Sequence, residues 1–465
     1  MARYQNTINT NISWIPQIPD HWNLMKVNAL FQERKYKVSD KVFSPLSVTK
    51  KGILPQLEHA AKTNNGDNRK LVKAGDFVIN SRSDRKSSCG VSKLDGSVSL
   101  INIVLTPREE LNGMYIHYLL RNYRFSEEYY RNGRGIVADL WTTRYSEMKS
   151  ILLPVPPRTE QDQIVRFLDW KVSEINKLIG IERGKIQNLE ELKNKAIDKA
   201  VIHGLKPQKE KLNEDIRWEI SYPSAWKIER LRNIFSFRKG LSITKANLEP
   251  NGIEVINYGQ IHSKKNTMVS LNEDLFKYVN ESYLETDAAS LVKKGDFIFA
   301  DTSEDLEGCG NCAYIDRCGE IFAGYHTVIA HPKERTNNKY FAYLFKSSVW
   351  RYQVCKKVNA VKVYSITQQI LKDVFLLVPS ELEQVQIVEY LDKLCYQIDE
   401  FISTAKKKIN ELEDMKAVVI SDVVTGKIDV RNVEIPEYEH IDDVVDDGDD
   451  EENEEEHADA EETEA

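Results

Sequence analysis

Apolar residues recur every three or four positions along two long stretches of the chain, residues 156–205 and 379–428. The spacing persists over many turns, which is typical of a coiled-coil seam and not of the stripe on a globular helix. We therefore expect two long spacer helices whose seams can pair with each other, in either direction. The predicted seam residues are Ile175, Ile179, Ile186 and Leu189 on the first stretch and Ile398, Ile402, Ile409 and Leu412 on the second.

Both stretches carry helix boundary signals. Ser380 and Glu383 form a capping box at the start of the second stretch, and Thr159 with Asp162 resembles one at the start of the first. Both stretches have a proline at their start, Pro157 or Pro379, and a glycine near their end, Gly204 or Gly426, so the helices are expected to lie between these residues.

Lys193 and Lys416 interrupt the seams at equivalent positions. A polar seam residue can fix the register of a coiled coil. The alternative, which we favour from the sequence, is that both ammonium groups reach water near a helix end.

Most of the chain is a tandem duplication. The segment "EQDQIVRFLD" at 160–169 returns as "EQVQIVEYLD" at 383–392, and "VKAGDFVIN" at 72–80 returns as "VKKGDFIFA" at 292–300. Trp14 and Trp22 likewise match Trp218 and Trp226. The sequence thus predicts a head, a spacer helix, a second head and a second spacer helix.

The two heads, residues 1–155 and 218–378, have an α+β pattern. The repeated Gly-Asp turn enters a short apolar run that reads as a buried strand, and "YIHYLL" and "YFAYLF" read as short helices. Residues 206–217 are the expected linker. Because the loops between these elements differ, we expect one scaffold that presents two different surfaces.

The net charge of −8 conceals two regions of opposite sign. Residues 432–465 hold 18 Asp and Glu and no Lys or Arg, which leaves 64 basic against 54 acidic residues, a net of +10, in the rest. A basic body favours nucleic acid as a partner. The segment 429–465 is predicted to be an acidic disordered tail, which either keeps the protein soluble or competes with DNA phosphates.

Basic residues in the loops that differ between the heads are the candidate DNA contacts. Arginine can bind guanine in a bidentate manner, whereas lysine more often meets phosphate. The alternative is that each is an ordinary solvated surface charge. The candidates are Arg82, Arg85, Lys86, Arg134 and Arg144 in the first head, and Lys264, Lys265 and Lys362 in the second.

A search for catalytic motifs gives no candidate catalytic or cofactor-binding residue. The chain lacks a Walker-type phosphate loop, an H-E-x-x-H helix and a G-x-S-x-G elbow. Cys309, Cys312, Cys318 and His326 could form a zinc site. We favour ordinary buried thiols, because the first head keeps only Cys89 of this set.

The doubled motifs resemble the specificity subunit of type I restriction-modification enzymes. The copies here read "VPPRTEQDQIV" and "VPSELEQVQIV", each after a "VKxGDF" turn, with "VVTGKIDV" at 423–430. The first copy departs from that ending, with "AVIHGL" at 200–205. The resemblance covers residues 14–431.

This resemblance implies two target recognition domains, each of which reads one half of a split double-stranded DNA site. It implies that the helices pair as an antiparallel coiled coil, which sets the gap between the half-sites. Partners implied are modification subunits, two of them, which methylate adenine with S-adenosylmethionine, and restriction subunits that use ATP and Mg²⁺. The family's specificity subunit has no catalytic residues and binds none of these cofactors itself.

Two alternatives remain: a coiled-coil scaffold whose heads bind proteins, and an enzyme with an unrecognised site. The chain has no run of 18 apolar residues and its start lacks an apolar signal region, so we expect a cytoplasmic protein without a membrane span.

Overall fold

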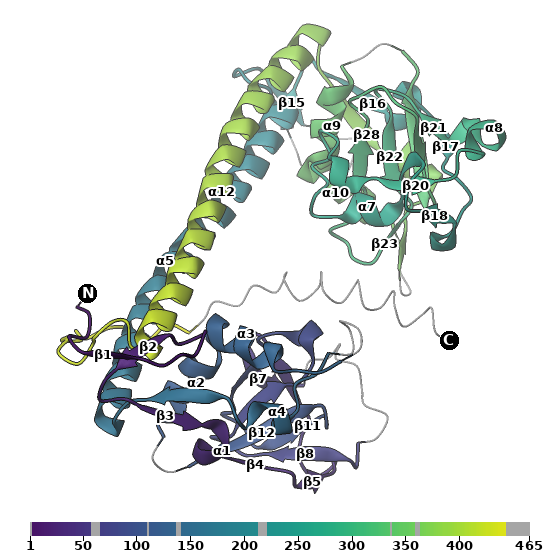
Figure 1. Ribbon diagram of the computed structural model, residues 1–465. Coiled ribbons are helices and arrows are strands. Elements are labelled where there is room, and N and C mark those ends of the chain that lie inside the picture. Colours follow the sequence, from purple (N-terminus) through teal and green to yellow (C-terminus); the bar gives the residue numbers. More distant parts are fainter. Residues whose placement is uncertain are drawn as a thin grey trace. The chain divides into compact units, whose positions relative to one another are not determined.

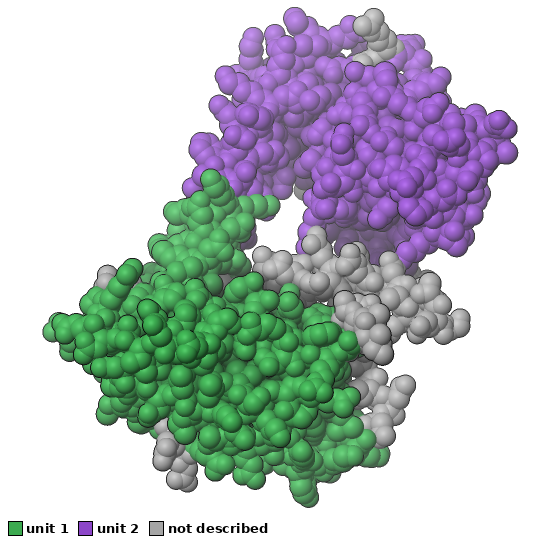
Figure 2. All heavy atoms as spheres, in the orientation of Figure 1, with its two compact units in different colours: residues 1–184, 405–465 green, residues 185–404 purple. Residues whose placement is uncertain are grey.

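The computed structural model describes residues 2–56, 66–108, 111–135, 141–212, 221–334, 337–358 and 363–442. The chain forms two compact units, coloured separately in Figure 2: unit 1 comprises residues 1–184 and 405–465, and unit 2 comprises residues 185–404. Each unit therefore contains one head and a part of both long helices, α5 (Arg158–His203) and α12 (Glu381–Val424). The units are described separately below.

The head of unit 1 is built on a four-stranded antiparallel sheet in the order β10-β9-β12-β4, of which β12 and β4 are labelled in Figure 1. Its strands are Cys89–Val91, Phe77–Asn80, Asn102–Pro107 and Phe31–Glu33. A second sheet has the order β11 (Gly96–Val98), β8 (Arg69–Val72), β5 (Lys37–Val38). Three antiparallel pairs complete the strands: β1 (Thr7–Asn9) with β2 (Gln17–Pro19), β3 (Asn23–Lys26) with β13 (Leu152–Val155), and β6 (Leu46–Thr49) with β7 (Gly52–Pro55). The helices are α1 (Val27–Leu30), α2 (Gly113–Leu120), α3 (Tyr123–Arg131) and α4 (Tyr145–Met148).

The head of unit 2 repeats this plan with a larger second sheet. Its four-stranded sheet has the order β24 (Cys312–Tyr314), β22 (Phe297–Ala300), β26 (Thr327–Pro332), β17 (Phe235–Lys239). A five-stranded sheet has the order β18 (Leu248–Glu249), β20 (Lys277–Val279), β19 (Ile253–Ile256), β25 (Ile321–Ala323), β21 (Leu291–Val292), in which β19 and β25 are parallel. The remaining pairs are β14 (Glu210–Leu212) with β15 (Ser221–Pro223), β16 (Lys227–Arg230) with β28 (Phe375–Val378), and β23 (Thr302–Ser303) with β27 (Tyr364–Ser365). The helices are α6 (Leu231–Ile234), α7 (Tyr258–His262), α8 (Tyr283–Thr286), α9 (Asn338–Lys346), α10 (Ser348–Cys355) and α11 (Gln368–Lys372).

The predicted duplication is visible in the strand order. The sequence β10-β9-β12-β4 of unit 1 corresponds element by element to β24-β22-β26-β17 of unit 2, and all these pairs are antiparallel. In both units two short helices, α2 with α3 and α9 with α10, pack beside this sheet. The expected α+β class with two similar heads is therefore confirmed.

The repeated Lys-x-Gly-Asp motif is a turn held by its own aspartate. Gly75 and Gly295 adopt φ of +92° and +99°, a conformation that a glycine takes without strain. The buried carboxylates of Asp76 and Asp296 accept hydrogen bonds from the backbone N–H three residues earlier, at 2.8 and 3.0 Å. The next strand of each four-stranded sheet starts from this fixed turn.

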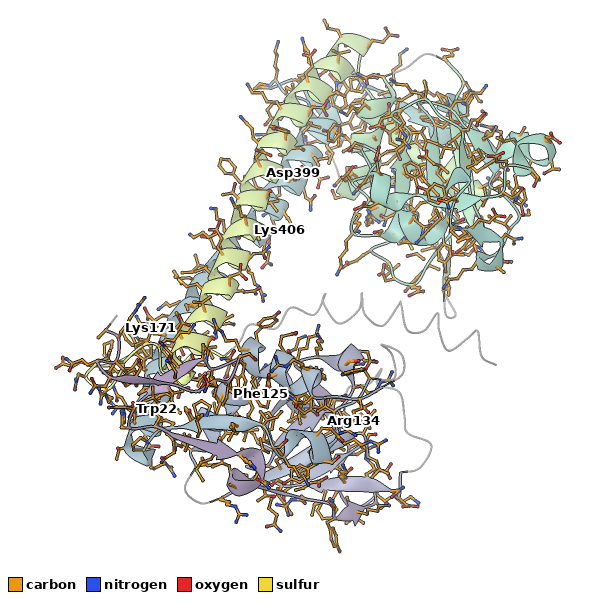
Figure 3. The ribbon with its side chains drawn as sticks, in the orientation of Figure 1. Trp22, Phe125, Arg134, Lys171, Asp399 and Lys406 are labelled. Atoms are coloured by element: carbon orange, nitrogen blue, oxygen red, sulfur yellow. The ribbon has the colours of Figure 1, made fainter. Side chains whose placement is uncertain are left out.

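The repeated Glu-Gln pair fixes the start of each long helix to its head. Glu160 accepts a hydrogen bond from the indole N–H of Trp22 at 3.0 Å, and Glu383 accepts one from Trp226 at 2.9 Å. The following glutamine, Gln161 or Gln384, donates back to a proline carbonyl at 3.0 Å in both repeats. In Figure 3, Trp22 lies beside the helix pair.

The helix starts differ from the predicted capping boxes. Glu383 N–H does reach Ser380 Oγ, at 3.4 Å, but the Glu383 carboxylate binds Trp226. In the first helix, Thr159 lies inside α5, and Asp162 instead accepts from Arg158 and Asn112.

Within each unit α5 and α12 run antiparallel. In unit 1, Asn176 meets Lys416 and Glu182 meets Lys408, so positions rise along one helix as they fall along the other. In unit 2, Lys193 meets Asp399, at 2.6 Å, whereas the end of the helix at Gly204 meets Glu383. The antiparallel pairing implied by the resemblance is thus confirmed, and the direction that the spacing alone left open is settled.

The two seam lysines do not reach freely into water, so the interpretation that we favoured is wrong. The Lys193 side chain is only 17% exposed and forms an ion pair with Asp399 of α12. Lys416 donates to the amide oxygen of Asn176, at 3.2 Å. Both lysines therefore bind a polar partner on the facing helix, which is what a register-fixing residue does.

The predicted seam is buried over most of its length. Ile175, Ile179, Ile409 and Leu412 in unit 1 and Ile398 and Ile402 in unit 2 are each at most 9% exposed. Ile186 and Leu189 are half-buried. Among the described residues, no helix is both long and apolar enough to cross a membrane.

Residues 429–442, which we expected to belong to a disordered tail, lie in defined contact with unit 1. Val430 is fully buried, and Val433 and Ile435 pack on the same core. The prediction was wrong for these residues because it was based on the composition of the whole segment 429–465. The many acidic residues of that segment outweigh its few apolar residues. Residues 443–465 lie outside the described residues.

Candidate nucleic-acid interface

Two loops with candidate DNA contacts pair with each other in unit 1. Arg134 exchanges two backbone hydrogen bonds with Thr142, at 2.8 and 3.0 Å, and Thr142 also forms a bridge with Arg82. Thr143 N–H then donates to the carbonyl of Ser81, at 2.9 Å. Arg82 and Arg134, which are 52 positions apart in the sequence, are thereby brought to one edge of the head.

The basic side chains at this edge project into solvent. Arg134, labelled in Figure 3, is 85% exposed. Arg85 and Arg144 are exposed as well. Such side chains can move to a phosphate or a base at little cost, because they hold only weak ion pairs. The pairs are Arg82 with Asp84 at 2.8 Å, Lys86 with Glu127 at 3.2 Å and Arg134 with Glu147 at 3.9 Å.

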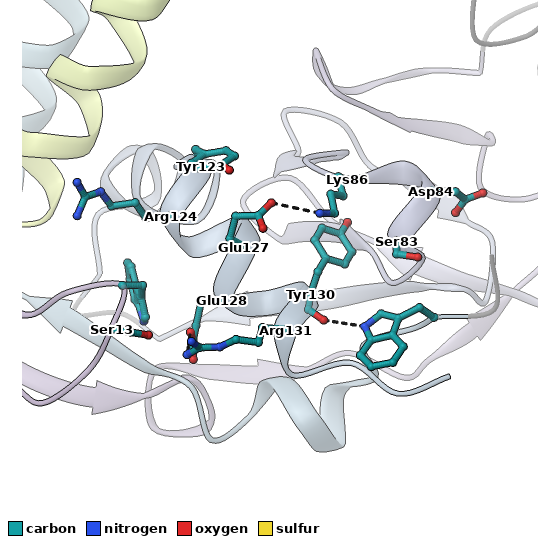
Figure 4. A pocket seen from close by; sticks show the side chains of 12 residues that line it. Ser13, Ser83, Asp84, Lys86, Tyr123, Arg124, Glu127, Glu128, Tyr130 and Arg131 are labelled. Atoms are coloured by element: carbon teal, nitrogen blue, oxygen red, sulfur yellow. Dashed lines mark hydrogen bonds and ion pairs between the residues drawn. The ribbon is translucent and has the colours of Figure 1, made fainter. Parts of the chain in front are cut away.

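An open pocket of about 850 Å³ adjoins this edge (Figure 4). Its lining mixes aromatic rings with charges of both signs, so it can stack a planar group and also donate or accept hydrogen bonds. The lining residues are Ser13, Trp14, Ser83, Asp84, Lys86, Tyr123, Arg124, Glu127, Glu128, Tyr130, Arg131 and Trp141.

Two aromatic residues fix the loops around the pocket. The Trp141 indole N–H donates to the carbonyl of Tyr130, at 2.7 Å (Figure 4). The Tyr130 hydroxyl donates in turn to the carbonyl of Arg85, at 3.2 Å, and burial raises the pKa of Tyr130 well above its usual value. Tyr130 therefore remains a neutral hydrogen-bond donor, and its bond to Arg85 fixes the backbone of the basic loop at residues 83–87.

Unit 2 has the equivalent edge with different chemistry. The pair β23–β27 joins Thr302 with Ser365 and Ser303 with Tyr364, in the place of the Arg82–Thr142 bridge. The loop that follows β23 reads "EDLEG" at 304–308, whereas the loop of unit 1 reads "SDRKS" at 83–87. This acidic loop would repel phosphates, so the candidate basic contacts of unit 2 lie on another element.

That element is the end of α7. His262 of α7 contacts the carbonyl of Thr302 through Nε2, at 2.8 Å, which ties α7 to β23. Lys264 and Lys265 follow directly and are both exposed, and Lys265 forms an ion pair with Asp274 at 3.4 Å. The structure therefore places these two predicted residues near the β23–β27 edge. Lys362, the third prediction for this head, lies outside the described residues.

A pocket of about 540 Å³ lies at the β23–β27 edge of unit 2. Asp301, Thr302, Ser365, Thr367 and Gln368 supply polar groups that sequence reasoning missed. An alignment of the two repeats would have identified the residues on β27 and after it, because residues 364–368 align with residues 141–145 of the first repeat. His326 in the same pocket adopts φ of +54°.

The cysteine cluster of unit 2 does not form a metal centre. Cys309 and Cys312 are fully buried, whereas Cys318 is exposed. Burial raises the pKa of Cys309 to about 11 and that of Cys312 further, so both remain protonated thiols. In the described part of the chain, no group of three or more His, Cys, Asp or Glu side chains is arranged to hold a metal ion.

Comparison with known proteins identifies one domain directly. Residues 223–414 match the family model of the type I restriction modification DNA specificity domain. The type I restriction enzyme MjaVIII specificity subunit of Methanocaldococcus jannaschii is 22% identical over 287 residues, which are 61% of this chain and 64% of that protein. The match thus spans slightly less than two thirds of this curated relative.

One solved structure shares the fold, and a second matches the chain with a lower TM-score. A chain from a study of complex assembly and conformational transition of the type I R-M system superposes with a TM-score of 0.61 at 14% identity, covering 88% of this chain and 99% of that one. The HsdS subunit of Thermoanaerobacter tengcongensis covers 88% of this chain and 98% of its own, at 16% identity and a TM-score of 0.43. The first of these likenesses establishes a common fold.

These matches confirm the resemblance to type I specificity subunits that is seen in the sequence. The family model covers less than half of the chain, residues 223–414, which include most of the head of unit 2 and much of α12.

Proposed function

We propose that the chain reads DNA for a type I restriction-modification complex and catalyses no reaction itself. Each head contacts one half of a split double-stranded site, and the helix pair sets the gap between the halves. Unit 1 uses Arg82, Arg134 and the adjoining loop, and unit 2 uses Lys264, Lys265 and the polar edge of β23–β27.

One observation supports this proposal above the others: both units present the same paired edge with different side chains. The Arg82–Thr142 bridge and the β23–β27 pair are the same backbone arrangement. The first is surrounded by arginines, carboxylates and aromatic rings, and the second by hydroxyls, an amide, a histidine, a lysine and one carboxylate. One scaffold with two chemistries is what the reading of two different half-sites requires.

Mapping of methylated adenines tests the proposal. The chain is combined with its modification subunits, and the methylated positions on a large DNA are sequenced. We expect two short half-sites separated by a fixed unread gap. Methylation without any sequence preference would contradict the reader role, and absence of DNA binding would favour the scaffold alternative.

Single-residue variants assign the half-sites. Arg134→Ala should relax one half-site only, with a loss of about 1–3 kcal/mol at one base pair if the contact is to a base. The double variant Lys264→Ala, Lys265→Ala should weaken binding to all sequences, as expected of phosphate contacts. Lys26→Ala on β3 is the control, because this exposed lysine lies outside both edges.

The helix pair is also the proposed docking platform for two modification subunits, which would carry S-adenosylmethionine. Restriction subunits with ATP and Mg²⁺ would complete the assembly. The part of α12 in unit 2 displays large apolar side chains in water, and exposed apolar patches of this kind mark protein interfaces. They are Leu382 (70% exposed), Val385 (42%), Tyr390 (46%), Tyr396 (66%) and Phe401 (58%).

Phe401→Ala tests the platform. Loss of an aromatic anchor in an interface costs about 2 kcal/mol or more of binding free energy. We expect a weaker complex with the modification subunit and unchanged folding of the chain alone. Equal affinity of the two forms would exclude this face.

A further inference from the structure

The C-terminal segment 430–442 lies along the part of α5 in unit 1. Gln163 donates its amide to the carbonyls of Val430 and Val433, at 3.1 and 2.9 Å. Farther along the helix, Asn176 donates to the carbonyl of Ile441, at 3.0 Å, and the Ile441 N–H donates to Ser173 Oγ, at 3.3 Å. From Gln163 to Asn176 the segment follows about 20 Å of helix.

This segment has no equivalent in the repeat among the described residues. In unit 2 the chain leaves α5 and forms β14, which pairs with β15. In unit 1 the matching place beside β2 is taken by β1, from the N-terminal end of the chain. Asp429 donates its N–H to the carbonyl of Ala2, at 3.0 Å, and the chain then continues onto α5. Residues 430–442 are therefore an addition to the duplicated plan.

The addition covers a helix face whose copy is open. Ser173 and Asn176 are each 2% exposed. Their repeat positions on α12, 223 residues later, are Tyr396 and Asp399. Tyr396 is 66% exposed and the Asp399 side chain 55%. The same stretch of α12 is the exposed apolar face that the proposed function assigns to a modification subunit.

We infer that residues 430–442 compete with one of the two modification subunits for its docking face. Two identical subunits that dock on a duplicated protein seek repeat-related faces. Among the described residues no chain segment covers the face on α12, where Tyr396 is exposed and Asp399 keeps its ion pair with Lys193, whereas the face on α5 is occupied by the chain itself. The first modification subunit therefore binds the α12 face, and the second binds only when the segment leaves α5. This inference rests on the proposed function and adds an internal control of subunit stoichiometry.

The test is a titration of the full-length chain with its modification subunit, followed by native mass spectrometry of the 1:1 and 2:1 complexes. A chain that ends after Pro436 loses the contacts at Ser173 and Asn176 but keeps Val433 and Ile435 in the core. We expect it to bind the second subunit about tenfold more tightly, which corresponds to 1.4 kcal/mol. An unchanged or weaker second affinity would overturn the inference.

Three further variants separate the possible causes. Ser173→Tyr introduces the residue found at the equivalent position of α12, Tyr396, beneath the segment 430–442. This variant should strengthen the second binding step, as the chain that ends after Pro436 does. Tyr396→Ser is its mirror in unit 2 and should weaken the first step. A chain that ends after Asp442 loses only the 23 residues beyond it, 14 of which are acidic, and should resemble the full-length chain. If this last variant binds as the shorter one does, charge repulsion and not occlusion is the cause, and the inference is wrong.

Failure of the proposed function gives a different result. If no form of the chain binds the modification subunit, the docking platform itself is wrong. If every form binds two subunits with equal affinity, the platform stands and only the competition is refuted.

Discussion

Removal of the Glu160 carboxylate should strongly destabilise unit 1. Its side chain is 5% exposed and accepts three hydrogen bonds: from Tyr4 at 2.6 Å, from Trp22 at 3.0 Å and, through a ring nitrogen, from His21 at 2.8 Å. Glu160→Ala leaves the Tyr4 hydroxyl and the Trp22 indole N–H without their acceptor. Tyr4 and Trp22 are themselves at most 7% exposed, so water cannot replace the carboxylate without opening the structure.

The size of the effect follows from these contacts. A hydrogen bond to a charged group contributes about 1.5–3 kcal/mol, and a buried donor left unpaired costs about 1–3 kcal/mol. The three bonds share one carboxylate and are not additive, so we expect a loss of about 3–5 kcal/mol for Glu160→Ala. Glu160→Gln keeps an oxygen for Tyr4 and Trp22 and should lose less than half of this.

The repeat supplies a matched control. Glu383 makes two such bonds, with Trp226 at 2.9 Å and Gln208 at 2.6 Å, and lies partly in water. Glu383→Ala should therefore cost only about 1–2 kcal/mol.

Hydrogen exchange measures both variants locally, because a chain of two units does not unfold in one step. We expect faster exchange in β1, β2 and the first turns of α5 for Glu160→Ala. If Glu383→Ala loosens its own unit as much as Glu160→Ala does, burial is not what sets the cost and the reasoning fails.

Three other predictions concern the seam, the charge and the thiols. Asp399→Ala leaves the nearly covered Lys193 unpaired and should speed local hydrogen exchange in the facing stretches of α5 and α12, whereas Lys193→Met, which fills the same space with apolar atoms, should leave that exchange unchanged or slow it; equal acceleration in the two variants would contradict this. DNA affinity should fall steeply with salt, and Lys264→Ala with Lys265→Ala should reduce the slope of log affinity against log salt by about 2; an unchanged slope would remove both lysines from the interface. In alkylation at pH 8 followed by mass spectrometry, exposed Cys318 should react first, and Cys309 should react faster as the pH rises towards its pKa of about 11, because the thiolate is the reactive form; fast labelling of Cys309 at pH 8 would show that it is not buried.

The two heads and the two long helices could be predicted from the sequence because the same motifs occur twice in the same order. The 3,4 spacing located both helices to within a few residues of Arg158–His203 and Glu381–Val424. Spacing could not give the direction of pairing, since a seam fits either way. Nor could it show that Lys193 has a partner, because Asp399 is 206 positions away.

The candidate interface was predictable only in part. Basic loops stand out in a sequence, and Arg82 and Arg134 do reach one edge of unit 1. The polar edge of unit 2 was missed because threonine, serine and glutamine carry no charge signal. The contacts of residues 430–442 were missed for a related reason: composition averages over a segment, whereas a few residues such as Val430 and Val433 make its contacts with unit 1.

The two tryptophans explain why each head needs both helices. Trp22 holds the start of α5 through Glu160 and also meets the end of α12 at Gly426, whose φ is +74°. Trp226 holds the start of α12 through Glu383 and meets the end of α5 at Gly204, whose φ is +75°. A side chain at Gly426 would strike Pro19 as well as Trp22. A substitution at the C-terminal end of one long helix therefore affects the head from which the other long helix begins. In unit 1 the two contacting residues, Trp22 and Gly426, are about 400 positions apart in the sequence, whereas in unit 2 Trp226 and Gly204 are about 20 apart.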